Sequence, residues 1–534
     1  MRRVSLNMRG PDDKKTERIC IAAGCLAAVI FVLAVFSAGN IDPLNTEWVI
    51  NGGGDNFQHY IGWRFFRESR WTRYLLFMRD LNYPVGTSVI VTDSNPLFCL
   101  IFKLFRNFLP ETFQFNGIWI LFSYIMIAYF AGKIGWRLSG DLWVSLIITL
   151  LCILNPVILQ RALIHDTLTA HWLILAAVYL FLDARNRLNP AGWFVLIWTA
   201  MLVHIYFVPM IGFIFCLQLI RMFIMRVPLK RTGITVLSAA AALLTGYFGM
   251  GYAHILPQSD SYGELSMNLN AFFNPDGVSA ILRSRPTMPL QYEGFNYWGL
   301  GLILLFAAGI AAGRRTYFQK ILPYFLPSVL LVLLAVSNHA YFDTGSVWRI
   351  EIPASVHSLL SVFRSSGRLA WPLYYLVLFA SVYALGKSRL SGKAVCCIMA
   401  VCLMVQACDL GQYCVEAAER FRAPANRIAG LPAGLETLIP DGTAHLFVSD
   451  VGGRNADALA LFAADRHMTY NRMANARSIR KVFGGDMVEM DKLTCAGLEP
   501  DSVYIWFTED VPDELYSCGD VAALNGWTVI RSGK

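Results

Sequence analysis

Long apolar runs separated by short polar segments dominate the chain up to residue 410. A helix that crosses a bilayer needs about 20 mainly apolar residues, and by this criterion the pattern predicts about eleven membrane-spanning helices. The first expected span follows a basic stretch, and no small-residue cleavage site comes after it. We therefore expect an uncleaved span and not a signal peptide. The expected spans are 19–38, 113–132, 143–160, 168–183, 191–206, 207–225, 233–252, 297–313, 320–337, 369–386 and 394–410.

The composition agrees with this pattern. Of the 534 residues, 56% are hydrophobic and 15% are charged, whereas soluble domains carry about 25% charged residues. This difference excludes an ordinary soluble enzyme, a disordered protein and a typical nucleic-acid-binding protein, so we expect membrane lipid and no nucleic acid among the partners. The net charge of +8 is explained by where the basic residues lie.

Basic residues set the expected orientation, because short cytoplasmic loops of membrane proteins are enriched in lysine and arginine. An N-terminus in the cytoplasm places every basic short loop inside and the C-terminus outside. The long polar segments then face outward: 39–112, 253–296, 338–368 and the tail 411–534. Basic residues of the expected inner segments include Lys14, Lys15, Arg18, Lys133, Arg137, Arg221, Arg226, Lys387, Arg389 and Lys393.

Two parts are therefore expected, a transmembrane domain over 1–410 and an outer domain over 411–534. In the tail, short β-like runs at 445–448, 503–507 and 528–530 alternate with a helical segment at 456–464, which predicts a small α/β domain. Cys495 and Cys518 flank one of its strands and could pair in an oxidising compartment.

The first outer loop contains two segments that we interpret as helices in the membrane interface. Residues 56–79 place apolar side chains near helical spacing, with arginines between them. Residues 95–109 are apolar but too short to span a bilayer.

Asp55 follows a run of glycines and comes directly before the first of these helices. It could act as a general base towards an acceptor hydroxyl at the membrane surface, with the glycines allowing substrate to approach the backbone closely. Equally, Asp55 and Gln58 could form a capping box. His59, one turn later, is a possible partner of Asp55 or an interfacial polar residue.

Further candidates lie between expected spans on the outer side. His165 and Asp166, near Arg161, could orient a substrate, although Asp166 could instead cap the next helix. His171 falls inside a span, where polar residues are costly and often functional, but a buried structural histidine is the alternative.

Arg364 and Arg368 are four residues apart, beside serine hydroxyls and a helix start, and could form a phosphate-binding site. Lipid-headgroup anchoring is the alternative. Glu293 lies in an aromatic-rich loop that fits either a sugar or lipid-phosphate site or an interfacial aromatic belt.

Taken together, the large first outer loop with its early aspartate, the two interfacial helices, the many spans and the outer tail resemble the GT-C superfamily of glycosyltransferases. These enzymes use sugars linked to polyprenyl phosphate. Over roughly 40–390, the segments GGGDNFQHYIGW, TDSNPL, HDTLTAHWLILAAVYLFL and FRSSGRLAWPLYYL resemble a bacterial family of multi-spanning proteins.

The resemblance implies a GT-C-like α-helical polytopic membrane protein of the bacterial inner membrane, active on its periplasmic face. It implies a transferase that moves a sugar from undecaprenyl phosphate to a cell-envelope glycan or lipid, with Asp55 as the base. The superfamily often has an adjacent acidic pair, whereas Asp55 has no acidic residue next to it, so a divalent metal (Mg²⁺ or Mn²⁺) at Asp55 stays undecided. The alternatives are a transporter or flippase, or a non-catalytic assembly factor, for lipid-linked glycans.

Overall fold

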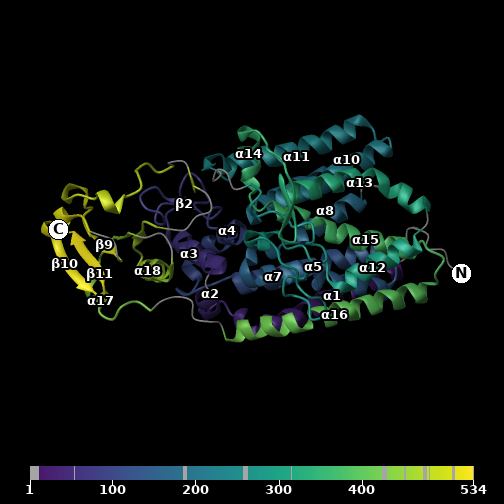
Figure 1. Cartoon of the computed structure of the whole chain (residues 1–534), viewed down its shortest axis with the longest axis horizontal. Coiled ribbons are helices and arrows are strands. Elements are labelled where there is room, and N and C mark those ends of the chain that lie inside the picture. Colours follow the sequence, from purple (N-terminus) through teal and green to yellow (C-terminus); the bar gives the residue numbers. More distant parts are fainter. Residues whose placement is uncertain are drawn as a thin grey trace. The chain divides into compact units, whose positions relative to one another are not determined.

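The computed structural model of the chain is mainly helical, with small β-sheets (Figure 1). Its described residues are 11–52, 54–183, 189–256, 262–313, 315–423, 430–449, 453–472, 478–479, 482–507 and 511–532. Gly53 of the glycine run before Asp55 therefore lies outside them. Two compact units can be distinguished. The first comprises Met1–Asp42, Gly117–Thr245 and Pro257–Ala423, and the second comprises Pro43–Asn116, Gly246–Leu256 and Pro424–Lys534.

Within the described residues, seven helical segments are long and apolar enough to cross a bilayer, which makes this a membrane protein. Each coincides with an expected span. The segments are Lys14–Val35, Asn116–Ser139, Leu142–Ile164, Phe207–Ile224, Leu229–Gly249, Ser366–Gly386 and Gly392–Arg422. The four remaining expected spans coincide with shorter apolar helices, Asp166–Leu182, Pro190–Val203, Leu300–Ala312 and Leu322–Val336.

Close helix packing in the first unit relies on small residues. Helix α12 (Leu300–Ala312) packs against α15 (Pro372–Gly386) and α16 (Gly392–Arg422). A Cβ at Gly309 would lie 3.0 Å from Cα of Ser381, so the backbones of α12 and α15 are nearly in contact there. Small residues at helix interfaces allow such an approach in membrane proteins.

Buried polar residues of α16 organise the start of α12. The Asp409 carboxylate accepts hydrogen bonds from the Leu300 backbone N–H (2.9 Å) and the Tyr297 hydroxyl (2.7 Å). Gln406 accepts from the Leu302 N–H at 3.2 Å. These bonds satisfy N–H groups that a helix start leaves without intrahelical partners.

In the second unit, the first loop folds into α2 (Glu47–Gly52), α3 (Gly54–Glu68) and α4 (Pro96–Leu104). The Asn95 side chain caps α4 by accepting from the Phe98 N–H at 3.3 Å. The continuous interfacial helix expected over 56–79 is wrong, because α3 ends at Glu68.

The two arginines of α3 are bound by other groups of the protein. Arg67 is buried and donates to backbone carbonyls, including those of Leu109 (3.0 Å) and Glu111 (3.1 Å). Arg64 is buried and donates to the Asp465 carboxylate at 2.8 Å. Protein groups therefore occupy the charged positions of α3 that we had assigned to the membrane interface.

The tail forms a five-stranded sheet, seen at the C-terminal end of the chain in Figure 1. Its order is β10-β11-β9-β6-β7, with β6 parallel to β7 and β9 and the remaining pairs antiparallel. With α18 (Gly453–Asp465), this is an α/β arrangement, and the three expected strands are present. The strands are β6 (His445–Val448), β7 (Thr469–Tyr470), β9 (Ser502–Trp506), β10 (Gly519–Leu524) and β11 (Trp527–Ser532).

A segment of the first loop extends this sheet. The Tyr470 N–H donates to the Asp80 carbonyl at 2.8 Å, and the Tyr83 N–H donates to the Tyr470 carbonyl at 3.0 Å. The Tyr83 ring stacks on the His445 ring with centroids 4.6 Å apart. The first loop and the tail, distant in sequence, thus form one unit.

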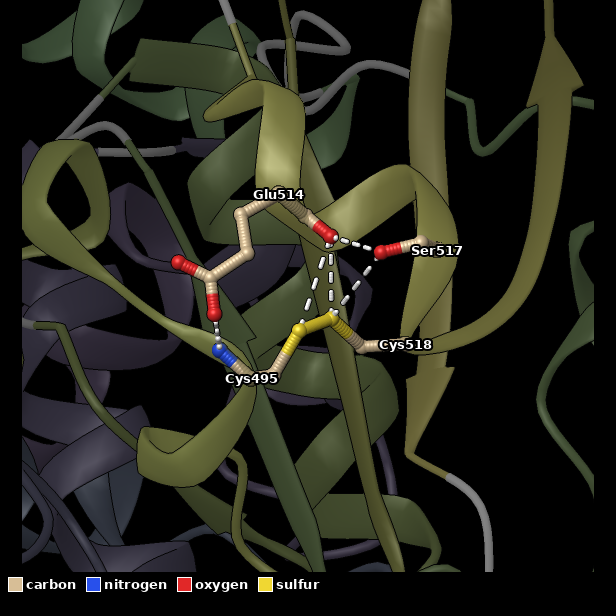
Figure 2. Close-up of a disulfide and its surroundings, with 4 residues drawn as sticks. All are labelled: Cys495, Glu514, Ser517 and Cys518. Carbon is tan, nitrogen blue, oxygen red and sulfur yellow. Dashed lines mark hydrogen bonds between the residues drawn. A yellow bond between two sulfur atoms is a disulfide. The ribbon is translucent and has the colours of Figure 1, made fainter.

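Cys495 and Cys518 form a disulfide beside the sheet, as Figure 2 shows. Their Cα atoms are 5.5 Å apart, within the usual range for bridged cysteines. The Glu514 carboxylate accepts from the Cys495 N–H at 3.1 Å, and the Ser517 hydroxyl donates to the Glu514 carbonyl at 2.7 Å. These bonds position the short helix Asp513–Ser517 against the bridge.

Candidate functional site

The first unit contains a buried cluster of charged residues in which one carboxylate faces two guanidinium groups. Glu293 Oε2 lies 2.7 Å from one terminal nitrogen of Arg368 and 3.0 Å from one of Arg161. The second terminal nitrogen of Arg161 also donates to the Glu293 carbonyl at 3.2 Å. All three side chains are at least nine-tenths buried. Two guanidinium groups thus share one carboxylate.

Three chain segments far apart in sequence supply these residues. Arg161 lies in the last turn of α7 (Pro156–Ile164), at the end of the candidate span Leu142–Ile164. Arg368 lies in a short 3-10 helix at the start of the candidate span Ser366–Gly386. Glu293 lies in the 3-10 helix Pro289–Gly294. The charges are therefore gathered where two apolar segments begin or end.

Two glycines bring these segments together. A Cβ at Gly367 would overlap Cα of Gly294, so the two backbones are in direct contact. Asn296 reinforces this contact, because its side-chain amide donates to the Gly294 carbonyl at 2.9 Å and the Gly367 carbonyl at 2.8 Å. The residues directly after Glu293 and directly before Arg368 are thus held side by side.

An aromatic ring lies beside each of the two arginines. The Arg161 guanidinium lies 5.6 Å from the ring centre of Trp371, and that of Arg368 lies 4.9 Å from the ring centre of Tyr206. Such cation–π contacts stabilise a desolvated cation. The Tyr206 hydroxyl also accepts from the Ser365 N–H at 2.8 Å, which couples this ring to the segment that carries Arg368.

The charges control the protonation of Glu293. Burial alone raises the pKa of a carboxyl group, but the positive charges of Arg161 and Arg368, with the hydrogen bonds from Arg368, hold the pKa of Glu293 well below its usual range. Glu293 is therefore ionised at neutral pH. It orients the arginines as a fixed counter-charge and is a poor candidate for a proton-accepting base.

His171 lies beside this cluster. Its ring stacks on Trp371 with centroids 4.8 Å apart, and its Nδ1 lies 2.9 Å from the Tyr375 hydroxyl. The side-chain amide of Asn155 donates to the same hydroxyl at 3.3 Å. Trp371 thus contacts both the His171 ring and the Arg161 guanidinium.

His165 and Asp166 are buried in the turn after α7. The His165 ring lies 5.5 Å from that of His204. The Asp166 carbonyl accepts from the Trp119 indole N–H at 3.1 Å, which anchors the turn.

Arg364 differs from its neighbour Arg368. It is half-buried, and within the described part of the chain no hydrogen bond or ion pair of its side chain is found. It lies at the end of the 3-10 helix Ser361–Phe363, between the two short helices of this segment. Of the predicted phosphate-binding pair, Arg368 is bound to Glu293, whereas among the described residues Arg364 has no such carboxylate partner.

In the second unit, Asp55 and His59 lie in α3. Asp55 is exposed in the first turn, where a helix start favours a negative charge, whereas His59 is buried one turn later. Asp55 belongs to none of the clusters of three metal-binding side chains found among the described residues. One exposed carboxylate is a poor ligand set for a divalent cation.

Sequence reasoning identified the four charged or polar positions that meet here, Arg161, His165, Glu293 and Arg368, but missed the aromatic partners. Trp371 and Tyr375 lie within the quoted segment FRSSGRLAWPLYYL. Aromatic residues directly after a buried arginine were the available signal. Tyr206 follows a polar break between two apolar runs and gave a weaker signal.

A protein-family model covers most of the chain. Residues 25–411 match the family described as Domain of unknown function (DUF6311). The chain belongs to this family. The matched region includes Asp55, Arg161, Glu293, Arg364 and Arg368, and it ends before the α/β tail. No curated protein and no solved structure matches the chain.

Proposed function

We propose that this protein is an integral membrane glycosyltransferase of GT-C type. It transfers a sugar from polyprenyl phosphate to a cell-envelope glycan or lipid acceptor on the outer face of the bacterial inner membrane. The proposal includes about eleven spans, by the length criterion for bilayer-crossing helices, with the N-terminus in the cytoplasm and the tail outside. The resemblance described above motivates the reaction class.

The single observation that supports the proposal most strongly is the cluster of Arg161, Glu293 and Arg368. Burying charge beside apolar spans is costly, and such residues in membrane proteins usually serve function. Two buried guanidinium groups share one carboxylate here, and Arg364 adds a further guanidinium four residues from Arg368. A lipid phosphate is the anion that a membrane supplies at such a position.

In the proposed reaction, Asp55 removes the proton from the acceptor hydroxyl, whose oxygen attacks the anomeric carbon of the donor sugar. The bond between that carbon and the phosphate oxygen breaks, and the lipid phosphate leaves with the bonding electrons. Attack opposite the leaving group inverts the anomeric centre. Exposure of Asp55 leaves its carboxylate accessible to an acceptor.

Arginines would stabilise the charge that develops on the departing phosphate, which is commonly a large contribution to catalysis. Arg364 is the candidate for direct contact, and Arg368 and Arg161 supply the positive field around it. Glu293 would keep both buried guanidinium groups in fixed orientation, so that little reorganisation accompanies the reaction.

The experiment compares surface glycans by mass spectrometry in a deletion strain that carries wild type, Asp55→Asn or Glu47→Gln at equal membrane abundance. Asparagine caps a helix nearly as well as aspartate but is a poor base. Glu47 is the matched control, because it is exposed in the first turn of α2.

Loss of a sugar mass with Asp55→Asn, and its retention with Glu47→Gln, would support the proposal. A wild-type glycan profile with Asp55→Asn, where the empty deletion strain is defective, would overturn the role of Asp55 and favour a flippase or an assembly factor.

A further inference from the structure

The second unit contains a cavity of about 600 Å³ with several charged side chains in its lining, a size typical of small-molecule sites. Residues of the first loop and of the tail line it together, and none of them belongs to the charged cluster of the first unit. Its polar and charged lining consists of Arg64, Glu68, Arg70, Thr72, Arg79, Asp80, His467 and Thr469, and its aromatic lining of Phe65 and Phe483.

Two of the charged groups are neutralised by protein. Arg64 is paired with the Asp465 carboxylate at 2.8 Å, and Glu68 is paired with Arg67 at 2.9 Å. These pairs fix the wall of the cavity that α3 provides. They add almost nothing to its net charge.

Three charged groups of the lining remain. Arg70 and Arg79 are exposed and Asp80 is half-buried. Among the described residues, no ion pair or side-chain hydrogen bond of these three is found, although the Arg79 guanidinium lies 6.0 Å from the ring centre of Tyr83. Burial raises the pKa of Asp80, against the lowering effect of Lys103 and Arg79.

We propose that this cavity binds an acidic sugar. Arg70 and Arg79 would bind the carboxylate or phosphate of the ligand, since guanidinium groups match the geometry of both anions. Asp80 would accept hydrogen bonds from sugar hydroxyls, an interaction that a simple inorganic anion cannot provide. Phe65 and Phe483 offer apolar surface to the ring carbons.

The site goes beyond the proposed function and does not depend on Asp55. The proposed ligand of this cavity, which the first loop and the tail line together, is a uronic acid or a sugar phosphate. Full-length protein in which Asp55 is replaced by asparagine should therefore bind these sugars like wild type, even if sugar transfer is lost. Failure of one proposal is thereby distinguishable from failure of the other.

The test measures binding to the full-length detergent-solubilised protein by saturation-transfer NMR, with D-glucuronate, D-glucose 6-phosphate and D-glucose as probes. We expect at least one charged sugar to bind and the neutral sugar not to bind. Binding should weaken at high salt, because exposed charges are screened. The two charged probes show whether the anion is a carboxylate or a phosphate.

Variants assign the binding to the cavity. Arg70→Gln combined with Arg79→Gln should weaken binding about tenfold or more, because hydrogen bonds to charged groups contribute strongly. Asp80→Asn should also weaken it. Arg73→Gln is the matched control, since Arg73 is exposed on the same segment, bonds to the Tyr74 hydroxyl at 2.7 Å and does not line the cavity.

Wild-type affinity in the Arg70 and Arg79 double variant, equal binding of D-glucose, or no binding of either charged sugar at about 10 mM would each overturn the proposal. The thermal unfolding midpoint of each variant, compared with that of Arg73→Gln, verifies that the protein remains folded. Because both arginines are exposed, the double variant is expected to fold normally.

Discussion

Arg368 donates two hydrogen bonds to one oxygen of Glu293, from Nε at 3.0 Å and from a terminal nitrogen at 2.7 Å. The same oxygen lies 3.0 Å from Arg161. One carboxylate therefore holds two buried guanidinium groups. Removing a partner from a buried ion pair costs far more than removing a surface pair, because it leaves a charge desolvated without compensation.

Glu293→Gln is accordingly expected to destabilise the protein by about 3–5 kcal/mol. The thermal unfolding midpoint in detergent measures the loss. Asp520→Asn is the control, since Asp520 is paired with Arg531 at the surface with its side chain 82% exposed, where such pairs contribute about 0–1 kcal/mol. Equal effects of the two substitutions would contradict the buried-cluster interpretation.

Ionisation of Glu293 should also be visible in the pH dependence of stability. The pKa of Glu293 in the folded protein is depressed, so its contribution is present above the unfolded value of about 4.3 and is lost as pH falls below it. The difference in unfolding midpoint between wild type and Glu293→Gln should stay constant from about pH 7 to pH 5 and narrow between about pH 5 and pH 3. A difference that stays constant down to about pH 3 would show that the pKa of Glu293 is not depressed in the folded state.

Lys103 should make stability depend on pH in the alkaline range. It is buried, donates to the Ser69 hydroxyl at 2.9 Å and lies 3.9 Å from the ring centre of Phe66. Burial and then the charge of Arg106 lower the pKa of Lys103 to about 8. Between that value and about 10.4, the unfolded chain binds more protons, so stability contributed by this residue rises with pH.

Unfolding midpoints from pH 7.5 to 10 should therefore rise less, or fall more, in Lys103→Met than in wild type. Lys393→Met, which removes an exposed lysine, should follow the wild-type curve. A Lys103→Met profile parallel to wild type would mean that Lys103 titrates like a solvated lysine.

The disulfide should stabilise the tail. It joins cysteines 23 residues apart, and loops of this size give about 2–4 kcal/mol of stabilisation. The double variant Cys495→Ser with Cys518→Ser should be cleaved in the tail at least about tenfold faster by a low concentration of protease, because local opening becomes more frequent. Cys216→Ser, which removes an exposed free cysteine, should be cleaved at the wild-type rate.

Hydropathy predicted the helical membrane part well, because span length and apolar composition are local properties. The strands at 445–448, 503–507 and 528–530 were also recognisable from local pattern. The interfacial helix over 56–79 was wrong because an amphipathic pattern shows only that one face is covered. In the structure Arg64 and Arg67 bind protein groups, a distinction that spacing cannot reveal.

The candidate site was predictable residue by residue but not as an assembly. Arg161, Glu293 and Arg368 were each conspicuous as charges beside apolar runs. Their meeting depends on the contact between Gly294 and Gly367 and on the bridging amide of Asn296. Such long-range contacts leave no periodic signal in the sequence. The extension of the tail sheet by residues 80–83 of the first loop was missed for the same reason.

The proposed sugar transfer can be measured as consumption of a lipid-linked sugar by the purified protein. Lipids extracted from the deletion strain should contain the accumulated polyprenyl-phosphate sugar, and membranes of the same strain supply the acceptor. With wild type, mass spectrometry should show this donor disappearing while polyprenyl phosphate and a glycosylated acceptor appear. Asp55→Asn should slow the conversion by about 10² to 10⁴, and Glu47→Gln should leave it unchanged. Conversion by Asp55→Asn at the wild-type rate, or none with wild type, would contradict a transferase with Asp55 as its base.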